Sequence, residues 1–156
     1  MSSTNTKIYP IEHDWVYNLF RTELLNSRVA ISKQDKNTKY ISWVNGVHPV
    51  AVVGYMNMKS GHIRLKTDYV RPQFRGQGIY SELFKSRLIL IFMTLKPKVL
   101  TAYCTPMSLP KYLKEGFVAM SERNGITYVK KQIENANAEL QRLESRIPSS
   151  LVKVNE

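Results

Sequence analysis

The chain has 156 residues, of which 43% are hydrophobic and 22% are charged. This length suffices for one domain with a buried core, and the composition is ordinary for a soluble globular protein. Lys and Arg number 23 against 12 Asp and Glu, so the net charge is +11. Such an excess favours an anionic partner, namely nucleic acid, an acidic membrane surface or a phosphate-rich ligand, although a merely basic surface would also produce it.

The sequence also excludes several classes of protein. Cys104 is the single cysteine, which rules out an internal disulfide and suits a reducing compartment. The first ten residues hold no apolar signal-peptide segment. The longest apolar run, residues 88–95, is too short to span a bilayer. We therefore expect a cytoplasmic protein without a membrane partner.

The first part of the chain predicts a helix followed by a β-hairpin. Residues 11–26 carry apolar side chains at helical spacing, chiefly Ile11, Trp15, Leu19 and Leu24. Residues 39–58 contain two β-rich runs on either side of Asn45-Gly46, which is a strong hairpin turn signal.

Residues 62–70 alternate in the period-two pattern of a β-strand. One face would carry Ile63, Leu65, Thr67 and Tyr69. The opposite face would carry Arg64, Lys66 and Asp68. The pattern therefore predicts that Asp68 shares a face with two basic side chains.

The order of the remaining elements predicts a mixed α/β (α+β) fold. A helix is expected over 78–95, a strand over 98–104, a short helix over 108–116 and a hairpin over 117–131. A single strand–helix–strand crossover would then form the centre of a mixed sheet.

Residues 132–156 differ in character from the first 131, which hold 20 of the Lys and Arg residues and only 8 of the acidic residues. We expect a domain over 1–131, followed by a C-terminal amphipathic helix and tail. The apolar seam of that helix is Ile133, Ala136, Leu140, Leu143 and Ile147. Packing on its own domain is favoured, and a homodimer contact is the alternative.

The turn within the stretch YVRPQFRGQGIYSELF, residues 69–84, has three interpretations. It could be a plain strand-to-helix connection. Gly76, Gly78 and Ser81 approximate a dinucleotide-binding turn, but no acidic residue ends the next strand, and no Gly-Lys-Ser/Thr indicates a Walker loop. Alternatively, the small residues, the start of a helix and the cation of Arg75 form an anion cradle suited to a pyrophosphate.

Two motifs resemble those of the GCN5-related N-acetyltransferase (GNAT) family. V-x-P-x-x-R-G-x-G-I, residues 70–79, resembles the family's acyl-CoA-binding motif and matches it at Arg75 and Gly78. The sequence departs from the motif at the following residue, Tyr80, where a small residue is usual. SLPKYLKEGF resembles a later family motif at Tyr112, Gly116 and Phe117, with Thr105 at a usual asparagine position. The resemblance covers roughly residues 6–131.

The resemblance implies a mostly antiparallel, splayed sheet flanked by helices, with acetyl-CoA or another acyl-CoA bound in the gap. The strands that end at Val70 and near Cys104 would border that gap. The residues that bind the cofactor would be Tyr69, Val70, Arg75, Gly76, Gln77, Gly78, Ile79 and Tyr80. Their backbone groups would hold the pyrophosphate and the pantetheine arm, and an N–H near Val70 would polarise the thioester.

The resemblance also implies Tyr112 as the proton donor to the leaving sulfur, with a buried structural tyrosine as the alternative. Asp68 is the first candidate for the base because it lies on the strand that leads into the site, although it could equally be a salt-bridged surface residue. His62 and His48 are weaker candidates, Cys104 is expected in the core, and no spacing of residues indicates a metal site.

Three functions are compatible with these features. The first is N-acetyl transfer from acetyl-CoA to an amine of unknown identity. The second is an acyltransferase-like enzyme that modifies a phage DNA base or tRNA, as suggested by basic residues and interleaved aromatic ones. These are Arg64, Lys66, Lys130 and Lys131, with Trp43, Tyr55, Tyr69 and Tyr103. The third is a non-catalytic module that binds coenzyme A or nucleic acid.

Overall fold

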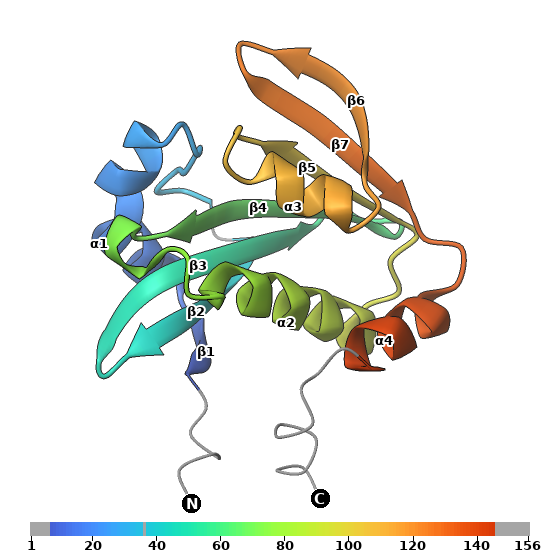
Figure 1. Ribbon diagram of the computed structural model, residues 1–156, viewed down its shortest axis with the longest axis horizontal. Coiled ribbons are helices and arrows are strands. Elements are labelled where there is room, and N and C mark those ends of the chain that lie inside the picture. Colours follow the sequence, from blue (N-terminus) through green and yellow to red (C-terminus); the bar gives the residue numbers. More distant parts are fainter. Residues whose placement is uncertain (1–6, 36, 146–156) are drawn as a thin grey trace, which may run out of the picture.

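The computed structural model describes residues 7–35 and 37–145, which form one seven-stranded sheet flanked by helices (Figure 1). The strand order is β1-β2-β3-β4-β5-β7-β6. The strands are β1 (Ile8–Ile11), β2 (Thr38–Asn45), β3 (His48–Asn57), β4 (His62–Val70), β5 (Val99–Cys104), β6 (Val118–Arg123) and β7 (Ile126–Gln132). The helices are α1 (His13–Asn26), α2 (Ile79–Thr94), α3 (Leu109–Lys114) and α4 (Ala136–Ser145). The predicted mixed α/β sheet is confirmed.

The N-terminal helix begins later than predicted, because residues 8–11 form an edge strand instead. Ile11 pairs with Tyr40 of β2, and Pro10 is tolerated because an edge strand needs no second row of hydrogen bonds. The buried face of α1 also differs from the prediction. It consists of His13, Val16, Phe20 and Leu24, whereas Trp15 is 62% exposed.

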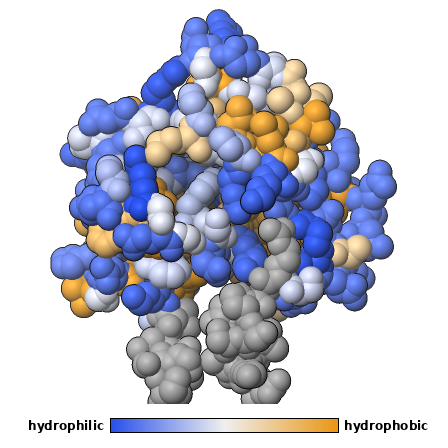
Figure 2. Space-filling view, viewed as in Figure 1, coloured by the Kyte–Doolittle hydropathy of each residue, from blue (hydrophilic) through white to orange (hydrophobic). Residues whose placement is uncertain are grey.

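The helices cover the two faces of the sheet, and Figure 1 shows α2 in front of the strands. Val16, Phe20 and Leu24 of α1 pack against one face, beside Val52 and Tyr69. On the other face, α2 packs against both halves of the sheet through Ile79, Leu83, Phe84, Leu88 and Ile91. On the side in view in Figure 2, an apolar patch lies over α3 and β6, where Leu113, Val118 and Met120 are exposed.

A β-bulge in β4 reverses the predicted orientation of Asp68. Tyr69 pairs with Val52 and Lys66 pairs with Gly54, so two residues of β4 oppose one residue of β3. Thr67 in this bulge has φ of +61°, a left-handed conformation that is rare for a β-branched residue. The extra residue turns Asp68 to the α2 side of the sheet, so the prediction that it shares a face with Arg64 and Lys66 is wrong.

β4 and β5 separate beyond the middle of the sheet. They are the parallel pair predicted for the crossover, and their pairing runs from His62–Val99 to Leu65–Ala102. Within the described part of the chain, Lys66, Tyr69 and Val70 pair with β3, and no residue of β4 after Leu65 pairs with β5. The two strand ends therefore border a space in the sheet.

The C-terminal helix packs against α2 of the same chain. Leu143 is 1% exposed in the core cluster that contains Phe84 and Leu88, and Ala136 and Leu140 lie against that cluster. The described part of the predicted seam is thus used within the chain. Ile147 and the expected tail lie outside the described residues, and the boundary at residues 131/132 stays a prediction. Across residues 7–35 and 37–145, no helix has the length and apolarity needed to cross a membrane.

Candidate active site

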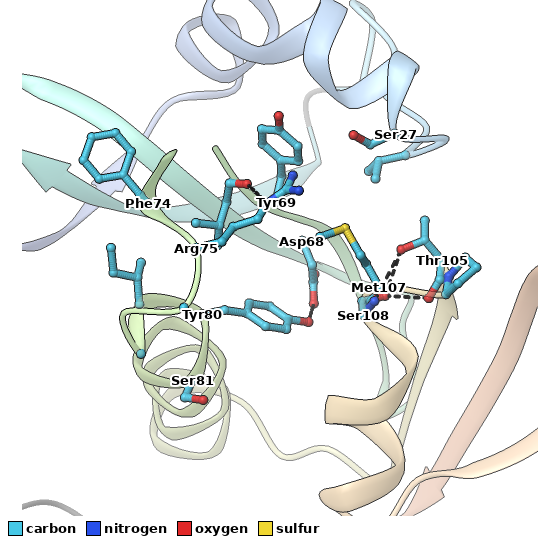
Figure 3. Close-up of a pocket in the computed structure, with 16 residues that line it drawn as sticks. Ser27, Asp68, Tyr69, Phe74, Arg75, Tyr80, Ser81, Thr105, Met107 and Ser108 are labelled. Atoms are coloured by element: carbon cyan, nitrogen blue, oxygen red, sulfur yellow. Dashed lines mark hydrogen bonds between the residues drawn. The ribbon is translucent and has the colours of Figure 1, made fainter. Parts of the chain in front are cut away.

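A cavity of about 600 Å³ lies where β4 and β5 separate. Three segments form most of its wall: the end of β4, the turn into α2, and the loop after β5. They contribute Asp68, Tyr69, Val70, Phe74, Arg75, Gly76, Gly78, Ile79, Tyr80, Ser81, Thr105, Pro106, Met107 and Ser108. Figure 3 shows these segments converging on one space, with Ser27 from the end of α1 at its far side.

The turn before α2 forms an open cradle of backbone. Gly76 has φ of +77° and Gly78, the N-cap residue of α2, has φ of +82°. Apart from the neighbouring chain, no atom of the described residues lies within 4 Å of the position that a Cβ would occupy at either glycine. Backbone N–H groups at a helix N-terminus bind anions, so the cradle fits a phosphate group. Gln77 does not line the cavity, and its side chain donates to the carbonyl of Gln73.

Val70 directs its backbone groups toward the cavity. The N–H of Arg71 donates to the carbonyl of Val50 on β3, which makes the Val70–Ala51 pair a non-hydrogen-bonded pair. The N–H and C=O of Val70 consequently point away from β3. Arg75 Nε donates to this carbonyl at 2.8 Å, which leaves the Val70 N–H directed at the cavity.

Below the cavity lies a buried cluster made of Asp68, Arg87, Tyr80 and Tyr112. Arg87 is fully buried and pairs with Asp68 through Nη1–Oδ1 at 2.6 Å and Nη2–Oδ2 at 3.0 Å. The hydroxyl of Tyr80 donates to Asp68 Oδ2 at 2.5 Å, and that of Tyr112 donates to the same oxygen at 2.8 Å. The two predicted catalytic residues, Asp68 and Tyr112, are thus hydrogen-bonded to each other through Oδ2 of Asp68.

Burial and charge strongly perturb this cluster. Burial raises the pKa of Tyr80 well above its usual value, and the negative charge of Asp68 raises it further. Burial likewise raises the pKa of Tyr112, despite the opposing charge of Arg87. For Arg87, burial acts to lower the pKa, but Asp68 outweighs that effect and the pKa is raised. Both tyrosines therefore stay protonated, and the arginine stays charged, at neutral pH.

Arg87 was missed in the sequence, although its position carried a signal. It lies three residues after Phe84 and four before Ile91, so helical spacing puts it on the buried face of α2. A charged residue at such a position needs a buried partner. Asp68 is that partner, but the partnership depends on the bulge, which the alternating pattern does not reveal.

The remaining candidate residues are not among those that line the cavity. Cys104 is buried in the main core, and burial raises the pKa of its thiol to about 12. His62 Nε2 lies 2.6 Å from the hydroxyl of Thr101 on β5, and His48 is exposed at the start of β3.

Comparison with known proteins identifies the fold and the family. A model of the acetyltransferase (GNAT) domain matches residues 15–135. No curated protein matches the sequence. Solved structures with the same fold include a GNAT-family acetyltransferase from Staphylococcus aureus Mu50, with a TM-score of 0.63 at 11% identity over 81% of this chain and 99% of that chain. An acyl-CoA N-acyltransferase from Pseudomonas aeruginosa has a TM-score of 0.65 at 14% identity over 80% of this chain and 97% of that chain.

A third structure with this fold contains coenzyme A. It is the PaiA N-acetyltransferase from Thermoplasma acidophilum, with a TM-score of 0.55 at 14% identity over 77% of this chain and 76% of that chain. The open glycine cradle and the separated ends of β4 and β5 fit such a ligand in this chain as well. The chain therefore belongs to the GNAT acetyltransferase family, whose enzymes transfer an acyl group from acetyl-CoA.

Proposed function

We propose that this protein transfers an acetyl group from acetyl-CoA to an amine by direct attack of the amine on the thioester. The observation that carries the proposal is the cavity between β4 and β5. It joins the glycine cradle at one end to Asp68 and Tyr80 at its wall. Acetyl-CoA supplies the activated acyl group, and the residues of this chain supply binding, orientation and proton transfer.

The predicted binding residues divide into two groups. Gly76, Gly78 and the first turn of α2 would hold the pyrophosphate through backbone N–H groups, with the positive end of the helix adding attraction. Val70 would hold the pantetheine arm along β4. The backbone groups of Tyr69 face β3 instead, because Tyr69–Val52 is the hydrogen-bonded pair next to Val70–Ala51, so the expected backbone contact of Tyr69 with the arm is not kept. Arg75 lies between the groups, donating to Val70 O and stacked over the Tyr69 ring at 5.5 Å.

The N–H of Val70 would stabilise the carbonyl oxygen of the thioester. Negative charge develops on that oxygen as the amine attacks, and a fixed N–H donor in a site shielded from water stabilises it strongly. Its direction away from β3 supports this role, because the group is not used by the sheet.

Asp68 and Tyr112 remain our candidates for proton transfer. Asp68 lines the cavity, which supports its carboxylate as the base that would take the proton that the amine loses. Tyr112 donates to Asp68, which supports Tyr112 as the source of the proton that the sulfur gains. Arg87 holds the carboxylate on its inner side and keeps the two groups aligned.

The test is incubation of the protein with acetyl-CoA and a panel of amines, peptides, tRNA and DNA, with free thiol and product mass as readouts. We expect acceptor-dependent thiol release and a mass gain of one acetyl group on the acceptor. Binding of coenzyme A without release from any acceptor in the panel would count against the enzyme function.

A nucleic-acid acceptor is the second candidate, and one surface favours it. On the sheet face opposite α2, Arg64 stacks over the ring of Tyr103 at 5.0 Å, and Tyr103 contacts Tyr128 at 4.8 Å. Arg64 and Lys130 both lower the pKa of His62, after the larger effect of burial. Among the residues that the structure describes, neither cation has a carboxylate within ion-pair distance. A cationic surface with an exposed aromatic ring suits a phosphate beside a base.

Fluorescence anisotropy with labelled DNA and RNA of mixed sequence tests this candidate. We expect binding that weakens with salt, and Arg64→Ser should reduce the slope of log K against log salt by about 1. Lys59→Ser, in the exposed turn before β4, is the matched control and should leave the slope unchanged. Equal effects of the two substitutions would remove the support for a dedicated surface.

A further inference from the structure

Tyr80 occupies the cavity in an unexpected way. It follows the cradle by two residues, at the position where the family motif has a small side chain. Figure 3 shows its side chain extending from the start of α2 across to Asp68 on β4. The ring packs edge-on against Phe84, with centroids 5.9 Å apart, and the hydroxyl is fixed on Asp68 Oδ2. The side chain therefore forms part of the cavity wall rather than turning out to solvent.

The two tyrosines of the cluster differ in their access to the cavity. Tyr80 lines it, whereas Tyr112 is not among the residues described along its wall. Tyr112 is 2% exposed, and its ring lies between Phe84 and Phe117, at centroid distances of 4.9 and 5.1 Å. Its hydroxyl is enclosed by Arg87 and Asp68. Of the two hydroxyl groups on Asp68 Oδ2, only that of Tyr80 belongs to a side chain on the cavity wall.

We propose that Tyr80 is the catalytic residue that gives its proton to the leaving sulfur, and that Tyr112 replaces this proton through Asp68. The inference rests on the proposed acetyl transfer. Both hydroxyls already donate to the same carboxylate oxygen, so a proton that leaves Tyr112 for Oδ2 is within hydrogen-bond reach of Tyr80.

The protons balance over one turnover. The amine nitrogen bonds to the acyl carbon, and the carbon–sulfur bond breaks with its electron pair on sulfur. Sulfur takes the proton of Tyr80, and Tyr80 takes that of Tyr112 by way of Asp68. The proton that the nitrogen sheds enters at Asp68 and restores Tyr112. The products are an amide and a free thiol, with the cluster returned to its first state.

Arg87 explains how Tyr112 can carry a transient negative charge. Its Nη2 donates to the Tyr112 oxygen at 3.1 Å, inside a cluster shielded from water. A cation at that distance stabilises a phenolate far better in a buried site than in solvent. Tyr80 has no such direct donor among the described contacts, so the charge is better held on Tyr112.

The test compares Tyr80→Phe and Tyr112→Phe with Tyr55→Phe. Tyr55 is a matched control because it is a partly buried tyrosine that packs against the same core cluster but does not line this cavity. Thiol release gives kcat and KM, and calorimetry compares binding of coenzyme A with binding of desulfo-coenzyme A. The second readout needs no turnover, and each variant removes a single hydroxyl.

We expect Tyr80→Phe to lower kcat about 100-fold with little change in KM. The wild-type protein should prefer coenzyme A over desulfo-coenzyme A by about three- to tenfold, and Tyr80→Phe should abolish that preference. Tyr112→Phe should keep the preference and lose about tenfold in kcat, as expected for a proton supplier one step removed. Tyr55→Phe should match the wild type in both readouts.

Two results would overturn the inference. One is a wild-type protein that binds the two ligands equally. The other is a preference that survives Tyr80→Phe but is lost in Tyr112→Phe, which would assign the sulfur contact to Tyr112. Failure of the proposed function is distinguishable, because it would abolish thiol release in the wild type and leave the binding preference and its dependence on Tyr80 measurable.

Discussion

Gly78 and Tyr80 lie two residues apart at the start of α2 and shape the cavity in opposite ways. Gly78 keeps space open, since its φ of +82° excludes most side chains and a Cβ there would enter empty space. Tyr80 instead fills space and brings a hydroxyl group to Asp68. The cradle and the proposed proton donor are therefore parts of one turn of chain.

Gly78→Ala should impair coenzyme A binding as well as stability. A side chain in the left-handed region costs about 1–2 kcal/mol, and the new methyl group also occupies the cradle. We expect coenzyme A affinity to fall at least about tenfold, measured by calorimetry. Gly46→Ala is the control, because Gly46 has φ of +68° with equally open surroundings but lies in the β2–β3 turn. It should lose stability without losing affinity, and a similar affinity loss in both would contradict the cradle.

Local motifs predicted some site residues and not others. Arg75, Gly76, Gly78, Ile79 and Tyr80 all line the cavity, because a motif within a single turn folds where its own residues place it. The direction of Tyr80 depends on Asp68, which lies twelve residues earlier on another element. The sequence therefore showed Tyr80 only as a departure from the motif and did not predict the direction of its side chain.

At the scale of elements, α2 and the bulge of β4 depend on each other. Arg87 Nη1 donates to the carbonyl of Gly54, beside the bulge on β3, at 3.0 Å, as well as to Asp68. The Arg87 side chain therefore donates hydrogen bonds to both β3 and β4 at the point where their register shifts. Without it, the buried carboxylate of Asp68 would lose its only charged partner among the described residues.

Arg87→Met should destabilise the protein by about 3–5 kcal/mol, because it leaves a buried carboxylate unpaired. Chemical denaturation measures the change. Asp68→Leu combined with Arg87→Met removes both charges, and this double variant should recover much of the lost stability. If the double variant were no more stable than Arg87→Met alone, the ion pair would not be the cause.

The order of elements was predictable because alternation and helical periodicity are local properties. The turn at Asn45-Gly46, the crossover from β4 to β5 and the closing hairpin all lie where the pattern indicates. The bulge was not predictable from the sequence, because it is defined by which residue of β3 opposes Thr67 and Asp68. β1 was missed because four residues that include Pro10 give too short an alternation.

At the scale of the molecule, we expect the folded state to be less stable at acid pH than at neutral or alkaline pH. Burial acts to raise the pKa of Asp35, but hydrogen bonds from Lys66 and Thr38 outweigh it and the pKa is lowered from 3.8. Glu139 behaves likewise, where Arg142 and Lys131 outweigh burial and the pKa falls below 4.5. A lowered folded-state pKa adds stability that is present above the unfolded-state value and is lost as pH falls through the folded-state value.

We therefore expect the urea midpoint to be level above about pH 5.5 and to decline through pH 4 and below. Asp35→Asn should flatten part of this decline, and Lys66→Met should do the same because it removes a principal cause of the shift. Lys59→Met, in an exposed turn, serves as the control. An acid decline that is equally steep in Asp35→Asn, Lys66→Met and the control would contradict the assignment to this pair.

One helix carries much of the site, and this has a consequence for partial unfolding. The cradle ends at the start of α2, and both Tyr80 and Arg87 belong to it. Proteins open in cooperative units smaller than the whole, and these units often coincide with supersecondary motifs. If α2 detached together with α4, the bulge would lose its arginine and the cavity one wall, while the strands remained paired. Catalytic activity would then be lost at a lower denaturant concentration than the β-sheet structure, leaving a protein with a folded sheet but no activity.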